Sequence, residues 1–140
     1  MAIGEKLFKE KITPVGFAIK SVGSEGVESE YSVTGEIIGF GKAQRRQGHQ
    51  YGTTRNLSRP SGITTGIAQG IMTTTDGDSV VWKLSYAGKS SGAGGKLTGT
   101  VTFTTVSEKL SWLNRTICVM EGKGEADPTK VGTNVFHEWS

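Results

Sequence analysis

Two neighbouring stretches decide the fold: Val80-Val81-Trp82-Lys83-Leu84-Ser85-Tyr86 and Leu97-Thr98-Gly99-Thr100-Val101-Thr102-Phe103-Thr104. In both, apolar side chains alternate with polar ones, and the second stretch carries threonine at every other position. A period of two is typical of a β-strand with one buried and one solvated face. The alternation therefore predicts antiparallel strands whose apolar faces share one core.

Similar stretches recur along the chain, separated by turn signals. The clearest signal is Asp76-Gly77-Asp78, because Asp-Gly between β-forming residues favours a hairpin. Eight strands are predicted, over residues 11–22, 27–43, 50–59, 63–75, 79–88, 96–106, 116–125 and 131–139. A helix of at most two turns is expected over residues 5–11. A single helical turn is expected over residues 107–114, whose leucines would plug an open end of the sheet.

Length and glycine content favour a closed barrel. A chain of 140 residues predicts a single domain over residues 1–140. The chain has 21 glycines, and many fall inside predicted strands, where glycine often marks strong coiling or a barrel corner. Consecutive strands with short connections then predict an all-β, eight-stranded antiparallel up-and-down barrel, because closure removes exposed edges. A two-sheet β-sandwich is the alternative.

Several classes of site are disfavoured by composition. Cys118 is the only cysteine, so no internal disulfide forms, and a buried structural role is expected for it. His49 and His137 lie far apart in the sequence and outside any metal motif, so neither a metal nor a cofactor is expected. The N-terminus lacks a signal-peptide core, and no stretch is long and apolar enough for a membrane helix, so a cytoplasmic location is expected.

The net charge of +3 is unevenly distributed. Residues 37–75 contain no acidic residue and five basic ones: Lys42, Arg45, Arg46, Arg55 and Arg59. This density is low for nucleic-acid binding, and the stretch is interpreted as a solvated face or a contact between copies of the chain, with binding of an anionic partner as the alternative. We expect a homo-oligomer, and neither a nucleic-acid nor a membrane partner. If the protein is an oligomeric structural protein, its contact between copies is expected along residues 37–62.

The C-terminal third carries a loose family resemblance. It runs through the strand Gly95–Phe103, the turn Lys109–Asn114, the strand Ile117–Gly122 and the closing Val135–Trp139. This order resembles the small calycin-like barrels of the allene oxide cyclase and dirigent type, and more closely uncharacterised microbial proteins of that shape. The resemblance implies an oligomeric eight-stranded barrel with a mostly apolar cavity. Allene oxide cyclase isomerises a fatty-acid-derived epoxide and dirigent proteins guide radical coupling, but neither catalytic set matches this chain.

Polar residues on otherwise apolar strand faces are the candidate site. Alternation places Gln69 with Ile67 and Ile71, and Glu121 with Ile117 and Val119. Together with aromatic wall residues, the candidate ligand-binding set of the lumen is Tyr51, Arg55, Gln69, Trp82, Tyr86, Phe103, Glu121 and His137. A one-residue slip in any strand would invert its assignment, so a purely structural role for these residues stays open.

Three hypotheses about function follow. The first is a barrel that binds a small apolar or amphipathic molecule in its lumen, which requires a cavity of roughly 300 Å³ or more. The second is a cyclase- or isomerase-like enzyme in the same cavity, with Glu121 as acid or base and Arg55 or His137 as its partner. The third is an oligomeric structural or interaction protein without a ligand.

Overall fold

The computed structural model describes residues 3–91, 94–124 and 132–140. Its strands are β1 (Ile3–Pro14), β2 (Ala18–Gly23), β3 (Gly26–Gly39), β4 (Gln47–Ser58), β5 (Ile63–Thr74), β6 (Ser79–Ser91), β7 (Gly94–Thr104), β8 (Ile117–Gly124) and β9 (Gly132–Trp139). Two 3₁₀ helices, η1 (Gly41–Ala43) and η2 (Ser111–Arg115), connect β3 to β4 and β7 to β8. The turn signal at residues 126–130 lies outside the described residues.

The strands form a closed antiparallel barrel of eight strands with one extra strand. From β3 to β9 each strand pairs with the next along the chain, and β1 closes the barrel by pairing with both β9 and β3. The extra strand β2 pairs with β3 just beyond the point where β1 leaves it. The predicted barrel is therefore confirmed. The predicted first strand, residues 11–22, is divided between β1 and β2.

The predicted helix over residues 5–11 is wrong, because this segment belongs to β1. Its lysines and glutamates are compatible with a helix locally, but pairing with β3 and β9 outweighs local preference. The β1–β9 register shifts between Lys6 and Phe8, and both Leu7 and Phe8 are buried around this irregularity. The segment thus supplies the strand that closes the barrel.

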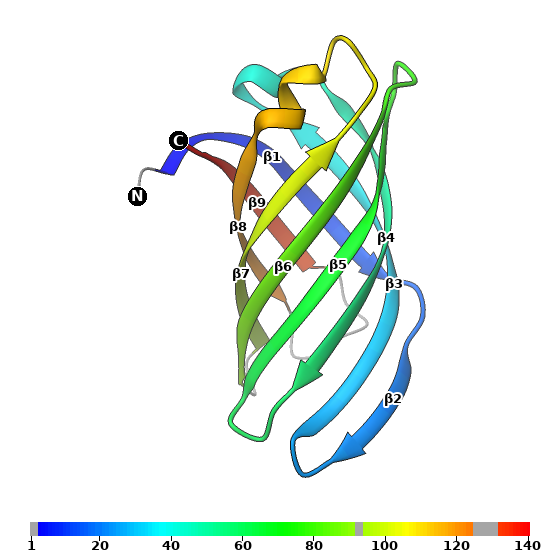
Figure 1. Cartoon of the computed structure of the whole chain (residues 1–140), viewed down its shortest axis with the longest axis vertical. Coiled ribbons are helices and arrows are strands. Elements are labelled where there is room, and N and C mark those ends of the chain that lie inside the picture. The colour runs from blue at the N-terminus through cyan, green and yellow to red at the C-terminus, as the bar shows by residue number, and fades with distance from the viewer. Residues whose placement is uncertain (1–2, 92–93, 125–131) are drawn as a thin grey trace.

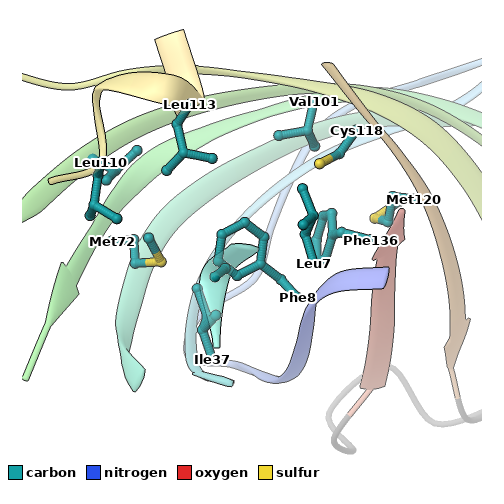
Figure 2. Close-up of a cluster of buried hydrophobic side chains, with 12 residues drawn as sticks. Leu7, Phe8, Ile37, Met72, Val101, Leu110, Leu113, Cys118, Met120 and Phe136 are labelled. Atoms are coloured by element: carbon teal, nitrogen blue, oxygen red, sulfur yellow. The ribbon is translucent and has the colours of Figure 1, made fainter. Parts of the chain in front are cut away.

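One end of the barrel is plugged, as the sequence predicted. Figure 1 shows η1 and η2 at one end and the β2–β3 hairpin reaching beyond the other. Leu110 and Leu113 are fully buried, and Trp112 packs against the same core. Figure 2 shows both leucines reaching toward a cluster that includes Met72 and Phe8. The β2–β3 hairpin therefore lies at the end of the lumen opposite the plug.

Candidate functional site

The inward faces of the strands enclose a small cavity. It measures about 70 Å³. Most of its lining is apolar, and four polar residues join it: Glu10, Gln50, Thr54 and Asn134. The apolar lining residues are Phe8, Ile12, Val33, Ile37, Ala68, Met72, Val80, Trp82, Leu84, Val101, Phe103 and Phe136. The volume is well below the ~300 Å³ at which drug-sized pockets begin, so side chains fill most of the lumen.

Three of the four polar residues form one buried cluster around the Glu10 carboxylate. Glu10 Oε1 accepts a hydrogen bond of 2.8 Å from Asn134 Nδ2, and Oε2 accepts one of 3.0 Å from Gln50 Nε2. Each of the three residues is at most 7% exposed. Asn134 lies directly opposite Glu10 in the β1–β9 pair, whereas Gln50 lies two strands away on β4.

Gly35 leaves space for the Gln50 side chain to reach Glu10 from two strands away. It lies on β3 between the two strands, opposite Ile12 of β1 and Gln50 of β4. A Cβ atom at this position would come within 2.8 Å of the Lys11 carbonyl oxygen and 3.2 Å of the Gln50 side chain. The glycine therefore leaves the Gln50 amide room to cross β3 and reach Glu10.

The Glu10 carboxyl is poised between its two protonation states. Burial raises its pKa to about 7, and the hydrogen bonds from Asn134 and Gln50 offset only part of that rise. The described lining contains no lysine, arginine or histidine that would hold the carboxylate ionised. The site can therefore hold or release a proton near neutral pH.

Two polar atoms in this region have no hydrogen-bond partner among the described residues. They are Gln50 Oε1, an acceptor, and Trp82 Nε1, a donor. Buried polar atoms are paired in most proteins, and an unpaired one in a cavity points to a bound water or ligand. The lumen thus offers an acceptor and a donor in addition to the Glu10 carboxyl.

The Trp82 ring explains the glycines of the neighbouring strands. Gly70 lies opposite both Trp82 and Gly52 in the sheet. A Cβ at Gly70 would come within 2.5 Å of Trp82 Cζ2, and one at Gly52 within 2.7 Å of the same atom. Tyr86 covers Gly66 in the same way. Small residues on the inward faces of β4 and β5 therefore make room for large aromatic side chains from β6.

This packing corrects part of the predicted lumen set. Trp82 and Phe103 line the cavity, and Tyr86 lies on the same inward face of β6. Tyr51, Arg55, Gln69 and Glu121 are exposed on the outer surface instead. His137 is half-buried and alternates with the inward-facing Phe136.

The physical reason is the phase of the strands. On β5 the inward positions are Gly66, Ala68 and Gly70, so Ile67 and Ile71 point outward together with Gln69. On β8 the inward positions are Met120 and Gly122, which leaves Glu121 outside. Glu121 therefore does not serve as an acid or base in the lumen.

The basic stretch is largely neutralised within the molecule. Arg55 pairs with Glu30 at 3.2 Å and Glu28 at 3.7 Å, Lys42 with Glu138 at 3.1 Å, and Arg46 with Asp76 at 3.1 Å. Tyr51 and Ile38 are exposed in the stretch where a contact between copies was expected. That contact stays a prediction.

Cys118 is fully buried, and burial raises the pKa of its thiol to about 12, with a smaller contribution from Glu138. The thiol is therefore a poor nucleophile at neutral pH.

In the described residues, no three His, Cys, Asp or Glu side chains gather as metal ligands do. Within the same ranges, no helix has the length and apolar character to cross a membrane.

Comparison with known proteins shows the fold. No protein-family model and no curated protein matches the sequence. A protein of unknown function from Clostridium acetobutylicum ATCC 824 has a similar structure, with a TM-score of 0.85, 17% identity and full coverage of both chains. A conserved protein of unknown function from Rhodopseudomonas palustris has a TM-score of 0.81 and 14% identity, over 99% of this chain and 98% of that one.

The third similar structure is an enzyme from Penicillium herquei. Its TM-score is 0.69 at 20% identity, over 96% of this chain and 92% of that one. These are small β-barrels, and at such identities the likeness concerns the fold alone. The chain is therefore a small eight-stranded barrel of the kind found in uncharacterised microbial proteins and in a fungal enzyme.

Proposed function

We propose that the lumen binds one small uncharged molecule that carries a hydroxyl or carbonyl group. The observation that carries the proposal is Gln50 Oε1, a buried acceptor that has no partner among the described residues and belongs to a residue lining an apolar cavity. A ligand hydroxyl would donate to this oxygen, whereas a ligand carbonyl would accept from the unpaired Trp82 Nε1. The apolar part of the ligand would contact Phe8, Phe103 and Phe136.

The cavity limits the size of this ligand. At about 70 Å³ it falls short of the requirement set by the first sequence-based hypothesis, so a drug-sized ligand does not fit in the closed lumen. The proposal is restricted to a molecule no larger than a single six-membered ring with one or two substituents, or to the polar end of a longer one.

The cavity also limits the ligand's charge. Glu10 is the only ionisable residue in the described lining, and no cation is present to pair with an anion. Burying an unpaired carboxylate beside Glu10 would be costly. An uncharged polar group is therefore favoured over the carboxylate of a fatty acid.

The test uses phenol and benzoate, which share a ring and differ in charge. Binding is followed by NMR at the indole N–H of Trp82, with the exposed Trp139 as an internal reference. We expect phenol to shift the Trp82 signal saturably and benzoate not to. Gln50→Leu should weaken phenol binding about two- to tenfold, the value of one neutral hydrogen bond, whereas Gln69→Leu on the outer surface should leave it unchanged.

Absence of any shift at Trp82, or equal binding by Gln50→Leu, would overturn the proposal. Thermal melting of each variant shows whether the barrel is intact. If the barrel is folded but binds neither probe, the third hypothesis is favoured, namely an oligomeric structural protein that has no ligand.

A second candidate is a cyclase- or isomerase-like enzyme in which Glu10, rather than Glu121, is the acid or base. The pKa of about 7 favours it, because general acid–base catalysis is most effective when the pKa lies near the working pH. The Penicillium herquei structure adds that an enzyme exists with this fold. Kinship with allene oxide cyclase or dirigent proteins belongs to this candidate and stays a prediction.

Cyclohexanone in D₂O tests the second candidate. The Glu10 carboxylate would take a proton from the α-carbon to form the enolate, and the deuterated carboxyl group, after exchange with solvent, would return a deuteron to the same carbon. We expect faster deuterium exchange than in buffer, lost in Glu10→Gln and kept in Glu121→Gln. Exchange no faster than in buffer, or equal rates in both variants, would argue against catalysis by Glu10.

A further inference from the structure

Residues 15–22, which run from the end of β1 into β2, expose an unusual number of apolar side chains. Val15, Phe17, Ile19 and Val22 are 59%, 61%, 59% and 74% exposed. The only charged residue among them is Lys20. Exposed apolar patches of this kind mark binding surfaces.

The β2–β3 register places Ile19 and Val22 on the lumen side of the hairpin. Ile19 lies opposite Ser29, and Val22 lies opposite Val27. Opposite residues in an antiparallel pair share a face, and Ser29 is buried on the same face of β3 as the cavity residue Val33. Phe17 stacks on Tyr31, with ring centroids 6.3 Å apart. The apolar face of the hairpin is therefore an extension of the inner wall of the barrel.

A line of inward positions joins this face to the cavity. Val33 and Leu84 line the cavity, and the next inward positions toward the hairpin are Tyr31 on β3 and Tyr86 on β6. Burial raises the pKa of both tyrosines, and each hydroxyl also affects the pKa of the other, so the two side chains lie close together. The Tyr86 hydroxyl makes no well-formed hydrogen bond among the described residues. Since η2 plugs the other end, this line leads from the cavity toward the hairpin end of the barrel (Figure 1).

From this continuity we infer that the face formed by Phe17, Ile19 and Val22 is a second subsite, which holds the apolar tail of the ligand whose polar end lies at Gln50 and Glu10. The inference rests on the proposed function. It follows from size, because a 70 Å³ cavity holds only the end of an elongated molecule. The ligand class is thus a neutral amphipath with a hydroxyl or carbonyl head and an apolar tail.

The charges around the hairpin favour this occupant over an anionic membrane surface. Glu25, Glu28 and Glu30 outnumber Lys20 along the hairpin, and Arg55 is engaged by two of the three glutamates. Anionic lipid headgroups would be repelled by this surplus of negative charge. A neutral apolar tail would not be repelled.

The test compares phenol with 4-hexylphenol, which share a head and differ in tail, by calorimetry on the full chain. Each methylene removed from water improves affinity about fourfold, so partial burial of the tail should give at least a tenfold advantage to 4-hexylphenol. Phe17→Ser/Ile19→Ser should reduce this advantage to about twofold or less without changing phenol affinity. Val106→Ser is the matched control, because Val106 is fully exposed and follows β7 near the plugged end.

The outcomes separate the two proposals. Phenol binding with no advantage for 4-hexylphenol, or an advantage that survives Phe17→Ser/Ile19→Ser, overturns the tail subsite and leaves the proposed function standing. Failure of both phenols overturns both. Sedimentation of the wild type as a dimer and of the double variant as a monomer would assign the face to a second copy of the chain and likewise overturn the inference.

Discussion

Glu10 and Asn134 face each other across the seam that closes the barrel. Asn134 donates a 2.8 Å hydrogen bond to the Glu10 carboxylate, although 124 residues separate the two in the sequence. β1 and β9 are the first and last strands, so this contact exists only once the sheet has closed. The candidate site therefore forms only when the barrel closes, and no single hairpin contains it.

Removing the Asn134 amide should raise the pKa of Glu10 further. The hydrogen bond from Asn134 stabilises the ionised carboxylate and lowers its pKa, so Asn134→Leu removes that effect while burial remains. We expect a Glu10 pKa above 7 in the variant, measured by ¹³C NMR titration of the side-chain carboxyl. Thr133→Val, one residue away on the other face of β9, is the control and should leave the titration unchanged. An unchanged or lower pKa in Asn134→Leu would contradict this.

Stability should fall as pH rises through neutrality. Glu10 titrates near 7 in the folded chain and at 4.5 when unfolded, so between these values the folded state binds the extra proton. The unfolding free energy then decreases with pH over this window, by about 3 kcal/mol for a shift of this size. Urea denaturation at pH 5 and pH 8 measures the difference. Glu10→Gln cannot ionise and should lose most of the pH dependence; the same slope in both proteins would refute the assignment to Glu10.

Gly70→Ala should destabilise the barrel by about 1–3 kcal/mol, as overpacking does in filled cores. The new Cβ would meet Trp82 Cζ2 and the carbonyl oxygen of Tyr51 at distances shorter than Cβ atoms adopt, so the ring or the backbone would have to shift. Chemical denaturation gives the value. Gly124→Ala is the matched control, since none of the residues that the structure describes lies within 4 Å of a Cβ there, and it should change stability by no more than ~0.5 kcal/mol. Equal effects at the two positions would remove the packing explanation.

Truncating the plug should also be costly. Leu113 is fully buried against the core, so Leu113→Ala is expected to cost about 2–5 kcal/mol, as cavity-forming substitutions do. Val106→Ala, at a fully exposed position in the same connection, should cost almost nothing. Thermal melting of the two variants in parallel distinguishes a structural plug from a loosely attached connection.

The fold was predictable because its signals are local. Alternation in β6 and β7, the Asp76-Gly77 turn and the leucines of the η2 connection each depend on a few neighbouring residues, and each indicated the observed structure. The segment over residues 5–11 was not predictable in this way. Its lysines and glutamates suit a helix, and only its pairing with β3 and β9, both distant in sequence, makes it a strand.

The candidate site was harder to predict, because it depends on which face of each strand points inward. Ile67 and Ile71 are larger than Gly66 and Gly70, so hydrophobicity alone favours the wrong face of β5. The deciding factor is Trp82 on the next strand, whose ring occupies the space above Gly70. Gln69 was assigned to the lumen for the same reason.

The sequence contains one pattern that indicates an inward-facing Glu10. Phe8, Glu10 and Ile12 alternate like a strand with a single polar residue on an apolar face. If the segment is a strand, the criterion that selects Glu121 selects Glu10 as well. Gln50 and Asn134 carry no comparable signal, because their role depends on reaching a carboxylate on another strand.

Diffraction from crystals soaked in 4-bromophenol tests the central claim most directly, because the bromine atom marks the ligand's position by anomalous scattering. We predict one bromine peak inside the barrel, with the phenol oxygen within hydrogen-bonding distance of Gln50 Oε1 or the Glu10 carboxyl and the bromine directed toward Tyr31 and Tyr86. A lumen without a peak in crystals that bind the compound on the outer surface would contradict the account.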